Sequence, residues 1–406
     1  MNCLKRGAAF SLALLMTFSL AACQKPGATP GPEPSASAAP APTPTPTPDP
    51  EEAVRTYWSE DQLTQAWGPN QVAGASLLPP GHRLSGVHLL PAPCRRTGRR
   101  GLDDWMLTAD EFKKILDELY RRDYILVNMC DVWSEYTTES GESRMQRNTL
   151  MLPEGKKPLV LSFDDVNYYE YMLAEGFTSK LVLGDDGQIW AQCTDPNTGE
   201  TFLTQDLDAT PILDQFVLEH PDFSLNGAKA IFSLTGYQGI LGYRTQNDID
   251  IAADDPRRPA FDANRQAEIE AVKPVIERLK ETGWTFGSHT WGHIRLDSRP
   301  LESVQRDTVR WAEEVGSLVG PHQHPVLPPR RPPRRGRLAL HRPGVPVSPE
   351  PGLPHLRQRG HQLLLLTSKK DISAVICDRL HPDGTTLRNG KPWSGTASST
   401  TRGRSI

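Results

Sequence analysis

Two polar clusters that could bind a metal ion follow two short apolar runs of the sequence. Asp164 and Asp165 come directly after the run 159–163, and His289 and His293 follow the run 284–287. Histidines four residues apart at the start of a helix would place both imidazoles on one face, one turn apart. Two imidazoles and one carboxylate form a three-ligand set with a position open for water, which is typical of catalytic zinc sites.

The two adjacent aspartates could divide the work of such a site. One carboxylate would bind the cation, and the other would accept the proton of an attacking water as general base. Each cluster alone has a plainer interpretation. An Asp-Asp pair after a strand is usually a helix cap or a turn, and a His-x-x-x-His pair is often a solvated helix face. Both clusters occur after strand-like runs, and the second has Gly287 just before it and Gly292 within it, which together favour one shared site.

The elements that would position these clusters alternate between strands and helices. Apolar runs of strand length occupy 124–129, 159–163, 228–234 and 284–287. Helical spacing of apolar residues occurs over 109–121, where Thr108 and Glu111 form a capping box, and over 265–280 and 301–318. Pro274 should kink the second helix or mark its late start. This alternation predicts an α/β fold with parallel strands, and in barrel-like α/β folds the carboxyl ends of the strands carry the active site.

The segment 166–208 interrupts this alternation. Asp186 and Gly187 lie between the apolar residues 181–183 and 189–190. An Asp-Gly pair between apolar runs indicates a tight turn, so an inserted β-hairpin is predicted here.

Both clusters resemble motifs of one enzyme family. The residues LSFDD at 161–165 resemble the first motif of the polysaccharide deacetylases, carbohydrate esterase family four, and SHTWGH at 288–293 resembles their second motif, His-Ser/Thr-x-x-His. AIFSLTG at 230–236 is similar to the strand between them. The resemblance covers about residues 105–320 and implies a distorted (β/α) barrel with fewer than eight strands.

The same resemblance implies roles for four residues. By position, Asp164 would be the catalytic base, and Asp165, His289 and His293 would hold a divalent metal, zinc being expected. The implied activity is hydrolysis of N-acetyl (or O-acetyl) groups on a cell-surface or wall polysaccharide. The alternative is a catalytically impaired lipoprotein that uses the barrel as a carbohydrate-binding or structural module.

The C-terminal part of the chain departs from the family pattern. The third motif, an Arg-x-Pro-Pro/Tyr-like strand end, and the late Leu-x-His motif that supplies the general acid are not recognisable, although Leu380 and His381 match the latter in part. Residues 321–360 are crowded with Pro, Arg and His and contain one acidic residue, Glu350. We therefore expect 321–406 to be a disordered tail or a stretch read out of frame, with a second suspect stretch at 91–100. Either would leave the barrel incomplete.

The N-terminus has the features of an export signal. Lys5 and Arg6 precede an apolar run over 8–20, and Ala21 and Ala22 lead into Cys23. This pattern resembles a bacterial lipoprotein signal over 1–23 with lipidation at Cys23, the alternative being an ordinary signal peptide. The Pro/Ala/Thr-rich residues 24–50 cannot bury a core and should act as a tether for a domain over 51–320. The protein would then be extracytoplasmic and attached to the membrane through lipid.

Composition adds limits on partners. The chain has 406 residues, 23% of them charged, and a net charge of -4, so nothing in the charge indicates a nucleic-acid partner. The six cysteines include no C-x-x-C pair, which argues against a cysteine zinc site. The expected partners are therefore an N-acetylated polysaccharide and, through the lipid anchor, a membrane; no protein partner is identified.

Overall fold

The computed structural model describes the chain in several ranges. Its backbone is described over 49–67, 84–87, 89–90, 106–296, 299–320, 326–327, 337–340, 364–369 and 372–380, and its side chains over 49–66, 106–296 and 299–320. All of these residues belong to a compact unit that begins at Pro48. The predicted signal peptide, Cys23 and nearly all of the predicted tether lie outside the described residues. Among the helices that are described, none has the length and apolar character needed to span a bilayer.

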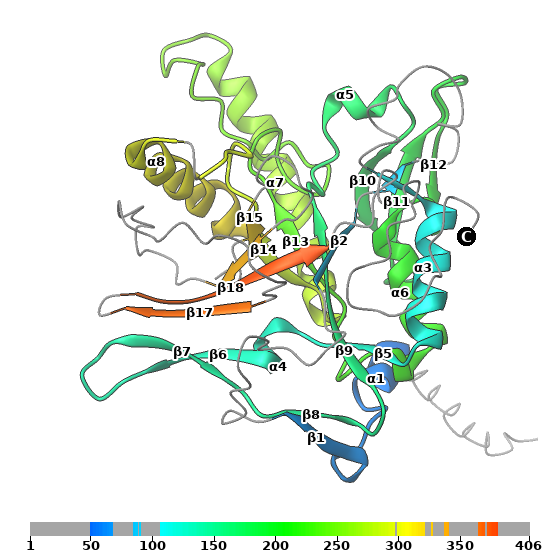
Figure 1. The fold of residues 1–406 in the computed structure, drawn as a ribbon. Helices are drawn as coiled ribbons and strands as arrows, with labels where there is room; N and C mark the ends of the chain where they lie inside the picture. Colours follow the sequence, from blue (N-terminus) through cyan, green and yellow to red (C-terminus); the bar gives the residue numbers. More distant parts are fainter. Residues whose placement is uncertain are drawn as a thin grey trace, which may run out of the picture. The chain divides into compact units, whose positions relative to one another are not determined.

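Parallel strands form the centre of the fold, as the sequence predicted (Figure 1). These parallel strands are β2 (Leu84–Val87), β9 (Lys157–Asp164), β13 (Ala230–Leu234) and β14 (Thr285–Ser288), and β5 (Tyr124–Leu126) pairs with the start of β9. Over the described strands the sheet runs in the order β14-β13-β9-β2-β18-β16-β15, where β18 is Ile372–Leu380, β16 is Arg337–Leu340 and β15 is Val326–Leu327. No hydrogen-bonded pairing among these strands closes the sheet, so the barrel remains a prediction.

The three predicted helices are present, the first with the predicted bounds and the other two with changed bounds. Helix α3 (Ala109–Arg121) begins with the predicted capping box, in which the backbone N–H of Glu111 donates to Thr108 Oγ1 at 3.2 Å. Helix α7 (Arg258–Glu281) contains Pro274 and begins earlier than expected, so the late start was wrong. Helix α8 (Leu301–Trp311) continues through a π-helical stretch (Ala312–Gly316) into α9 (Ser317–Val319). The remaining helical elements are α1 (Pro50–Arg55), η1 (Glu60–Gln62), α4 (Met129–Val132), α5 (Glu170–Leu173), α6 (Ala209–Glu219) and η3 (Pro221–Phe223).

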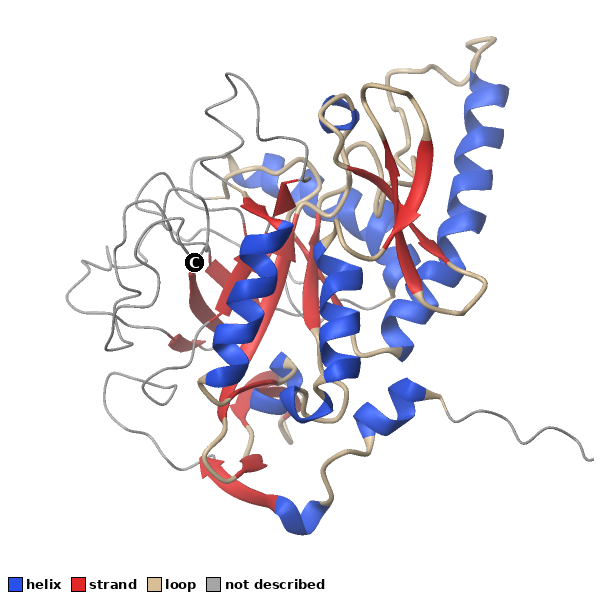
Figure 2. Cartoon of the chain, turned by 90° about the vertical axis from the view of Figure 1, so that its right-hand side faces the viewer, coloured by secondary structure: helices blue, strands red, loops and turns tan. Residues whose placement is uncertain are grey.

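The predicted insertion is an antiparallel sheet. Its strands are β10 (Thr178–Leu183), β11 (Ile189–Thr194) and β12 (Thr201–Thr204), so the hairpin across Gly187 is confirmed and gains a third strand. The face of this sheet contacts α6 and α7, and Figure 2 shows it beside the helices that flank the parallel strands. Short antiparallel pairs join β1 (Leu63–Trp67) to β8 (Leu150–Pro153) and β6 (Trp133–Thr137) to β7 (Ser143–Arg147), whereas β3 (Leu89–Leu90) and β4 (Leu107–Thr108) pair in parallel.

Apolar side chains are buried on both faces of the parallel strands. Phe163 of β9 lies in the larger core, with its ring centroid 5.8 Å from that of Phe112 on α3 and 5.3 Å from that of Trp284. Val160 of β9 and Ile231 of β13 lie in a smaller core on the opposite face. Burial on both faces explains why these strands appear in the sequence as continuous apolar runs rather than as alternating ones.

The C-terminal region contains four strands, where a tail without regular structure was expected. They are β15 (Val326–Leu327), β16 (Arg337–Leu340), β17 (Leu364–Lys369) and β18 (Ile372–Leu380). Strand β18 extends the sheet in parallel beside β2, with Leu380 opposite Ser85. The apolar runs at 363–366 and 374–377 contain strand-forming residues. The prediction of a tail without regular structure rested on the many prolines of 321–360 and did not consider these runs. The remaining residues of 321–406 and the suspect stretch 91–100 lie outside the described residues.

Candidate metal centre

The two predicted clusters meet at the carboxyl end of β13. This strand pairs with β9 on one side and β14 on the other, which places Asp164 opposite Ser233 and Ser288 opposite Leu234. Just beyond these pairs, the backbone N–H of Asp165 donates to the Ser233 carbonyl at 3.1 Å, and that of His289 donates to the Leu234 carbonyl at 2.8 Å. One strand therefore holds both clusters in register.

Asp165, His289 and His293 form a compact group of three possible metal ligands. One donor atom from each residue lies within 4.8 Å of the other two. His293 Nε2 is 3.6 Å from Asp165 Oδ2, and the two imidazole centroids are 4.9 Å apart. The His289 side chain is 1% exposed and that of His293 is 40% exposed, so the group is buried on one side and open to solvent on the other.

Asp164 lies on the buried side of this group. Its Oδ2 is 3.9 Å from His289 Nε2, and both side chains are 1% exposed. Strand alternation accounts for this position, because Asp164 shares a face of β9 with Val160 and Ser162, away from the face of Phe163. The two aspartates thus occupy different environments although they are neighbours in the sequence.

The histidines are not on a helix, so that part of the prediction was wrong. They lie in the loop after β14, and the next helix, α8, begins only at Leu301. Thr290 (φ 66°) and His293 (φ 52°) have left-handed backbone conformations, which break any helical repeat between His289 and His293. Such conformations cost about 1–3 kcal/mol each and are found mainly where surrounding contacts enforce them. The imidazoles therefore meet through a strained loop rather than through helical spacing.

Asp307 of α8 enforces the shape of this loop. Its Oδ1 accepts the backbone N–H of Trp291 at 2.7 Å, and its Oδ2 accepts that of Gly292 at 2.8 Å. Burial raises the pKa of Asp307, while these two hydrogen bonds and the charge of Arg310 act in the opposite direction. A single carboxylate thus binds the two residues in the middle of the His-x-x-x-His segment.

The indole of Trp291 fixes the same loop from its other side. It donates to Glu314 Oε2 at 3.1 Å, and the Arg310 guanidinium lies 3.4 Å from the ring centroid. The Trp291 carbonyl accepts the backbone N–H of Gly236 at 2.9 Å. A Cβ at Gly236 would lie 2.1 Å from Trp291 Cδ1, so this close approach requires glycine.

Tyr169 orients the carboxylate of Asp165. Its hydroxyl donates to Asp165 Oδ1 at 3.0 Å and lies 2.6 Å from Thr235 Oγ1. Burial, followed by the charge of Asp165, raises the pKa of Tyr169, so its hydroxyl keeps its proton near neutral pH. With Oδ1 held in this way, Oδ2 is the oxygen nearer to His293.

No sequence pattern predicted the roles of Asp307, Tyr169 and Thr235 in supporting the proposed metal ligands. Asp307 falls on the polar side of an amphipathic helix, where acidic residues are ordinarily solvated. Tyr169 and Thr235 lie close to the recognised segments, but neither follows a spacing that predicts a contact with Asp165.

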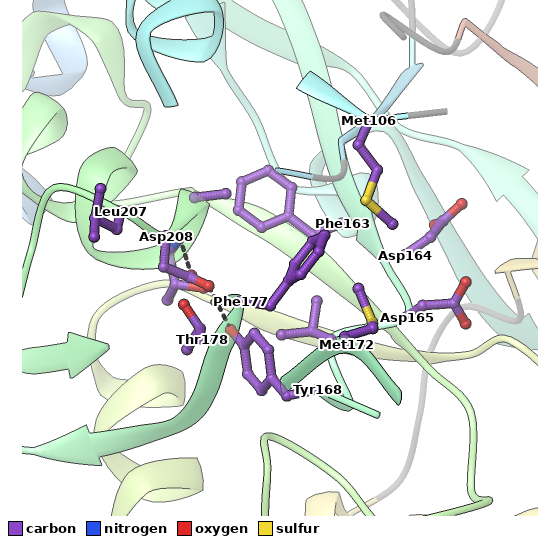
Figure 3. A pocket seen from close by; sticks show the side chains of 13 residues that line it. Met106, Phe163, Asp164, Asp165, Tyr168, Met172, Phe177, Thr178, Leu207 and Asp208 are labelled. Carbon is purple, nitrogen blue, oxygen red and sulfur yellow. Dashed lines mark hydrogen bonds between the residues drawn. The ribbon is translucent and has the colours of Figure 1, made fainter. Parts of the chain in front are cut away.

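A pocket lies beside the two aspartates (Figure 3). Within it, the Tyr168 hydroxyl donates to Asp208 Oδ2 at 2.8 Å, and Asp208 Oδ1 accepts the Thr210 backbone N–H at 2.8 Å, which caps α6. Burial raises the pKa of Asp208 and, together with the Asp208 charge, that of Tyr168. Figure 3 shows the carboxyl groups of Asp164 and Asp165 turned away from this pair. The pocket is lined by Met106, Phe163, Asp164, Asp165, Val166, Tyr168, Met172, Phe177, Thr178, Leu207, Asp208, Ala209 and Thr210.

The three-residue group fits a divalent cation. Two imidazoles and one carboxylate are the donor set of many catalytic metal sites with an open position, and the donors are close enough to share one ion. The hydrogen bond from Tyr169 to Asp165 is the kind of outer contact that orients a metal-binding carboxylate.

A comparison with known protein families agrees with the resemblance of the second motif, at 288–293. Residues 259–335 match the family model described as polysaccharide deacetylase, a range that contains all but the first residue of α7, together with β14, both histidines and α8. The sequence matches no curated protein. Among solved structures, the chain is similar to the Streptococcus pyogenes deacetylase PplD in complex with acetate, with 13% identity, a TM-score of 0.27, and coverage of 58% of this chain and 68% of that one. The match shows that residues 259–335 are similar to the polysaccharide deacetylase family.

Proposed function

We propose that this protein is a metal-dependent hydrolase that removes N-acetyl (or O-acetyl) groups from a cell-surface or wall polysaccharide. The similarity of residues 259–335 to the polysaccharide deacetylase family supports the reaction class. The observation that carries the proposal is the grouping of Asp165, His289 and His293 within 4.8 Å of one another, with a further carboxylate, Asp164, 3.9 Å from His289. Metal ligands and a candidate base thus occupy one site.

Each residue of the site has a proposed role. Asp165, His289 and His293 would hold the cation, which we propose to be zinc, and a bound zinc ion would supply Lewis acidity to the acetyl carbonyl and to the attacking water. Asp164 would accept the proton of that water. Its burial limits competition from bulk solvent. The exposed edge of His293 marks the side from which a glycan can approach.

The environments of the two aspartates favour this division of roles. The Asp165 carboxylate is oriented by Tyr169 and lies 3.6 Å from His293, as a ligand should. Asp164 is absent from the three-residue group and lies against the buried His289. A carboxylate beside the cation but not bound to it remains able to take a proton.

We further propose that the enzyme acts outside the cell while anchored to the membrane. The basis is the sequence alone, with a signal over 1–23, lipid on Cys23, a tether over 24–50 and a deacetylase domain over 51–320. A flexible tether would let the domain reach glycans at some distance from the bilayer. For 321–406 we retain the proposal of an altered reading frame within that region, which translation of the coding DNA in all three frames would test.

Zinc content and acetate release, measured together, test the proposed reaction. We would purify the full chain, determine zinc by elemental analysis, and assay acetate release from a pentamer of β-1,4-linked N-acetylglucosamine. Asp164→Asn should retain zinc and lose acetate release by about 10²-fold or more, whereas Asp165→Asn should lose both. Asp250→Asn, at an exposed position, is the matched control.

The other outcomes are also informative. Zinc loss in Asp164→Asn would mean that the roles of the two aspartates are reversed. Full acetate release by this variant would contradict the proposed base. A wild-type chain that binds the pentamer without releasing acetate would instead support the non-catalytic carbohydrate-binding alternative.

A further inference from the structure

Three tyrosines next to the metal centre form a stack of nearly parallel rings. The ring of Tyr169 makes an angle of 7° with that of Tyr237 at a centroid distance of 4.5 Å. It makes an angle of 15° with the ring of Tyr171 at 5.7 Å. Tyr169 is 2% exposed, whereas Tyr171 on α5 is 63% exposed. The stack thus runs from a buried ring to one that faces solvent.

This stack is tied directly to the proposed metal ligands. Its buried member, Tyr169, donates a hydrogen bond to Asp165 at 3.0 Å. Tyr171 stacks on Tyr169, so one tyrosine connects the exposed ring to the Asp165 carboxylate.

Within the described part of the chain, Tyr171 stacks on Tyr169 and remains 63% exposed. An exposed aromatic face beside the proposed metal centre is a surface that a sugar ring could cover. Polar residues adjoin the stacked tyrosines in the sequence, with Glu170 between Tyr169 and Tyr171 and Gln238 directly after Tyr237. The Glu170 carboxylate lies 3.9 Å from Arg244, and the side chain of Gln238 accepts the Glu170 backbone N–H at 2.8 Å.

An aromatic face bordered by polar groups matches the chemistry of a sugar ring. A pyranose has an apolar face of C–H groups, which can lie flat on an aromatic ring, and a rim of hydroxyls, which need hydrogen-bonding partners. Glu170, Arg244 and Gln238 offer carboxylate, guanidinium and amide groups at the border of the stack.

We infer that Tyr171 is a sugar-stacking residue, the exposed end of a tyrosine platform that binds a pyranose ring next to the acetylated residue of the substrate. The inference rests on the proposed function, since it assumes that Asp165 belongs to the deacetylation site. The platform would hold the glycan chain beside the metal centre, because its central ring, Tyr169, is hydrogen-bonded to the Asp165 carboxylate.

Binding to an oligosaccharide tests the platform separately from catalysis. We would use the full chain with zinc and the Asp164→Asn substitution, so that the probe is not consumed, and titrate it calorimetrically with the β-1,4-linked N-acetylglucosamine pentamer. Adding Tyr171→Ala should weaken binding about tenfold, the order expected for loss of one ring contact. Tyr171→Phe should stay within about twofold, because the ring and not the hydroxyl makes the contact.

Controls and acetate assays separate failure of the platform from failure of the proposed function. Tyr136→Ala removes another exposed tyrosine, 42% exposed on β6, and should leave binding unchanged. Zinc content should be equal in all variants. Unchanged binding by Tyr171→Ala, or no binding by the parent, would overturn the platform even if the wild-type chain releases acetate. Binding that depends on Tyr171, in a wild-type chain that releases no acetate, would support the platform and reject the hydrolytic function.

Discussion

Asp307 holds the backbone of Trp291 through a hydrogen bond of 2.7 Å, and its second carboxylate oxygen holds the next N–H, that of Gly292, at 2.8 Å. Helix α8 thereby fixes the middle of the loop whose ends carry His289 and His293. The loop needs this support because Thr290 and His293 have left-handed backbone conformations. The preorganisation of the two imidazoles therefore depends on a residue that is far from them in the sequence.

Asp307→Asn should weaken metal binding without removing a ligand. An amide offers one acceptor oxygen where two are needed, and its NH₂ group would face a backbone N–H. Loss of such support typically lowers metal affinity about 10- to 100-fold. Competition with a fluorescent zinc chelator measures this affinity. Glu302→Gln, at an exposed acidic position on the same helix, is the matched control. Equal zinc affinity in Asp307→Asn and wild type would refute the role of Asp307.

His289→Ala and His293→Ala should each sharply reduce zinc occupancy. Each substitution removes one of three protein donors, and a cation held by two donors is bound far more weakly. Elemental analysis after dialysis gives the occupancy, for which the wild type should approach about one ion per chain. His220→Ala removes a histidine that packs against Tyr120, away from the metal group, and should retain zinc. Unchanged occupancy in both site variants would rule out the assignment.

The sequence predicted the parts of the fold that local pattern determines. The strand leading to Asp164, the capped helix at Thr108 and the turn at Gly187 all follow from hydrophobic period and turn chemistry. The loop of His289 and His293 could not be predicted, because its shape depends on a contact with Asp307 across a tertiary interface. A spacing of four residues looks the same in a helix and in a loop that happens to turn back.

Gly236→Ala should disturb the metal centre from outside it. The added methyl would lie 2.1 Å from Trp291 Cδ1, so the indole and the loop that carries it must move. We expect weaker zinc binding and a loss of stability of about 1–3 kcal/mol, measured by chelator competition and by urea unfolding. Gly141→Ala, where no atom lies within 4 Å of the added Cβ, should keep wild-type zinc affinity and controls for a glycine-to-alanine change without a clash at the site. Wild-type zinc affinity in Gly236→Ala would contradict this contact.

Cys23→Ser should abolish lipid attachment. The prediction rests on the small residues that precede the cysteine at the end of an apolar run. In a bacterial host, metabolic labelling with a fatty acid should mark the wild type and not the variant, and the variant should remain uncleaved or be released from the membrane fraction. Cys3→Ser is the matched control. Equal labelling of Cys23→Ser would eliminate the anchor.

Glu51→Gln should change how stability depends on pH. Glu51 on α1 is 1% exposed and pairs with the buried Lys229 at 3.0 Å, and Lys229 also contacts Asp214 at 2.5 Å. Burial raises the pKa of Glu51 above its usual 4.5, while the charge of Lys229 opposes that rise. The folded protein therefore binds this proton more tightly than the unfolded chain does. The stability that Glu51 contributes is present below about pH 4.5 and is lost as pH rises through the higher folded pKa.

The wild type should accordingly lose stability relative to Glu51→Gln as pH rises from about 4 toward neutrality. Urea unfolding followed by tryptophan fluorescence across this range gives the difference in free energy of unfolding at each pH. Glu52→Gln, at the neighbouring position with a side chain 62% exposed, should follow the wild-type profile. A wild type that gains stability relative to Glu51→Gln over this range would mean that the attraction of Lys229 outweighs the cost of burying the carboxylate. The substitution acts at the amino end of β13, whereas the metal group lies at its carboxyl end. Zinc affinity should therefore be the same in both proteins wherever both are folded.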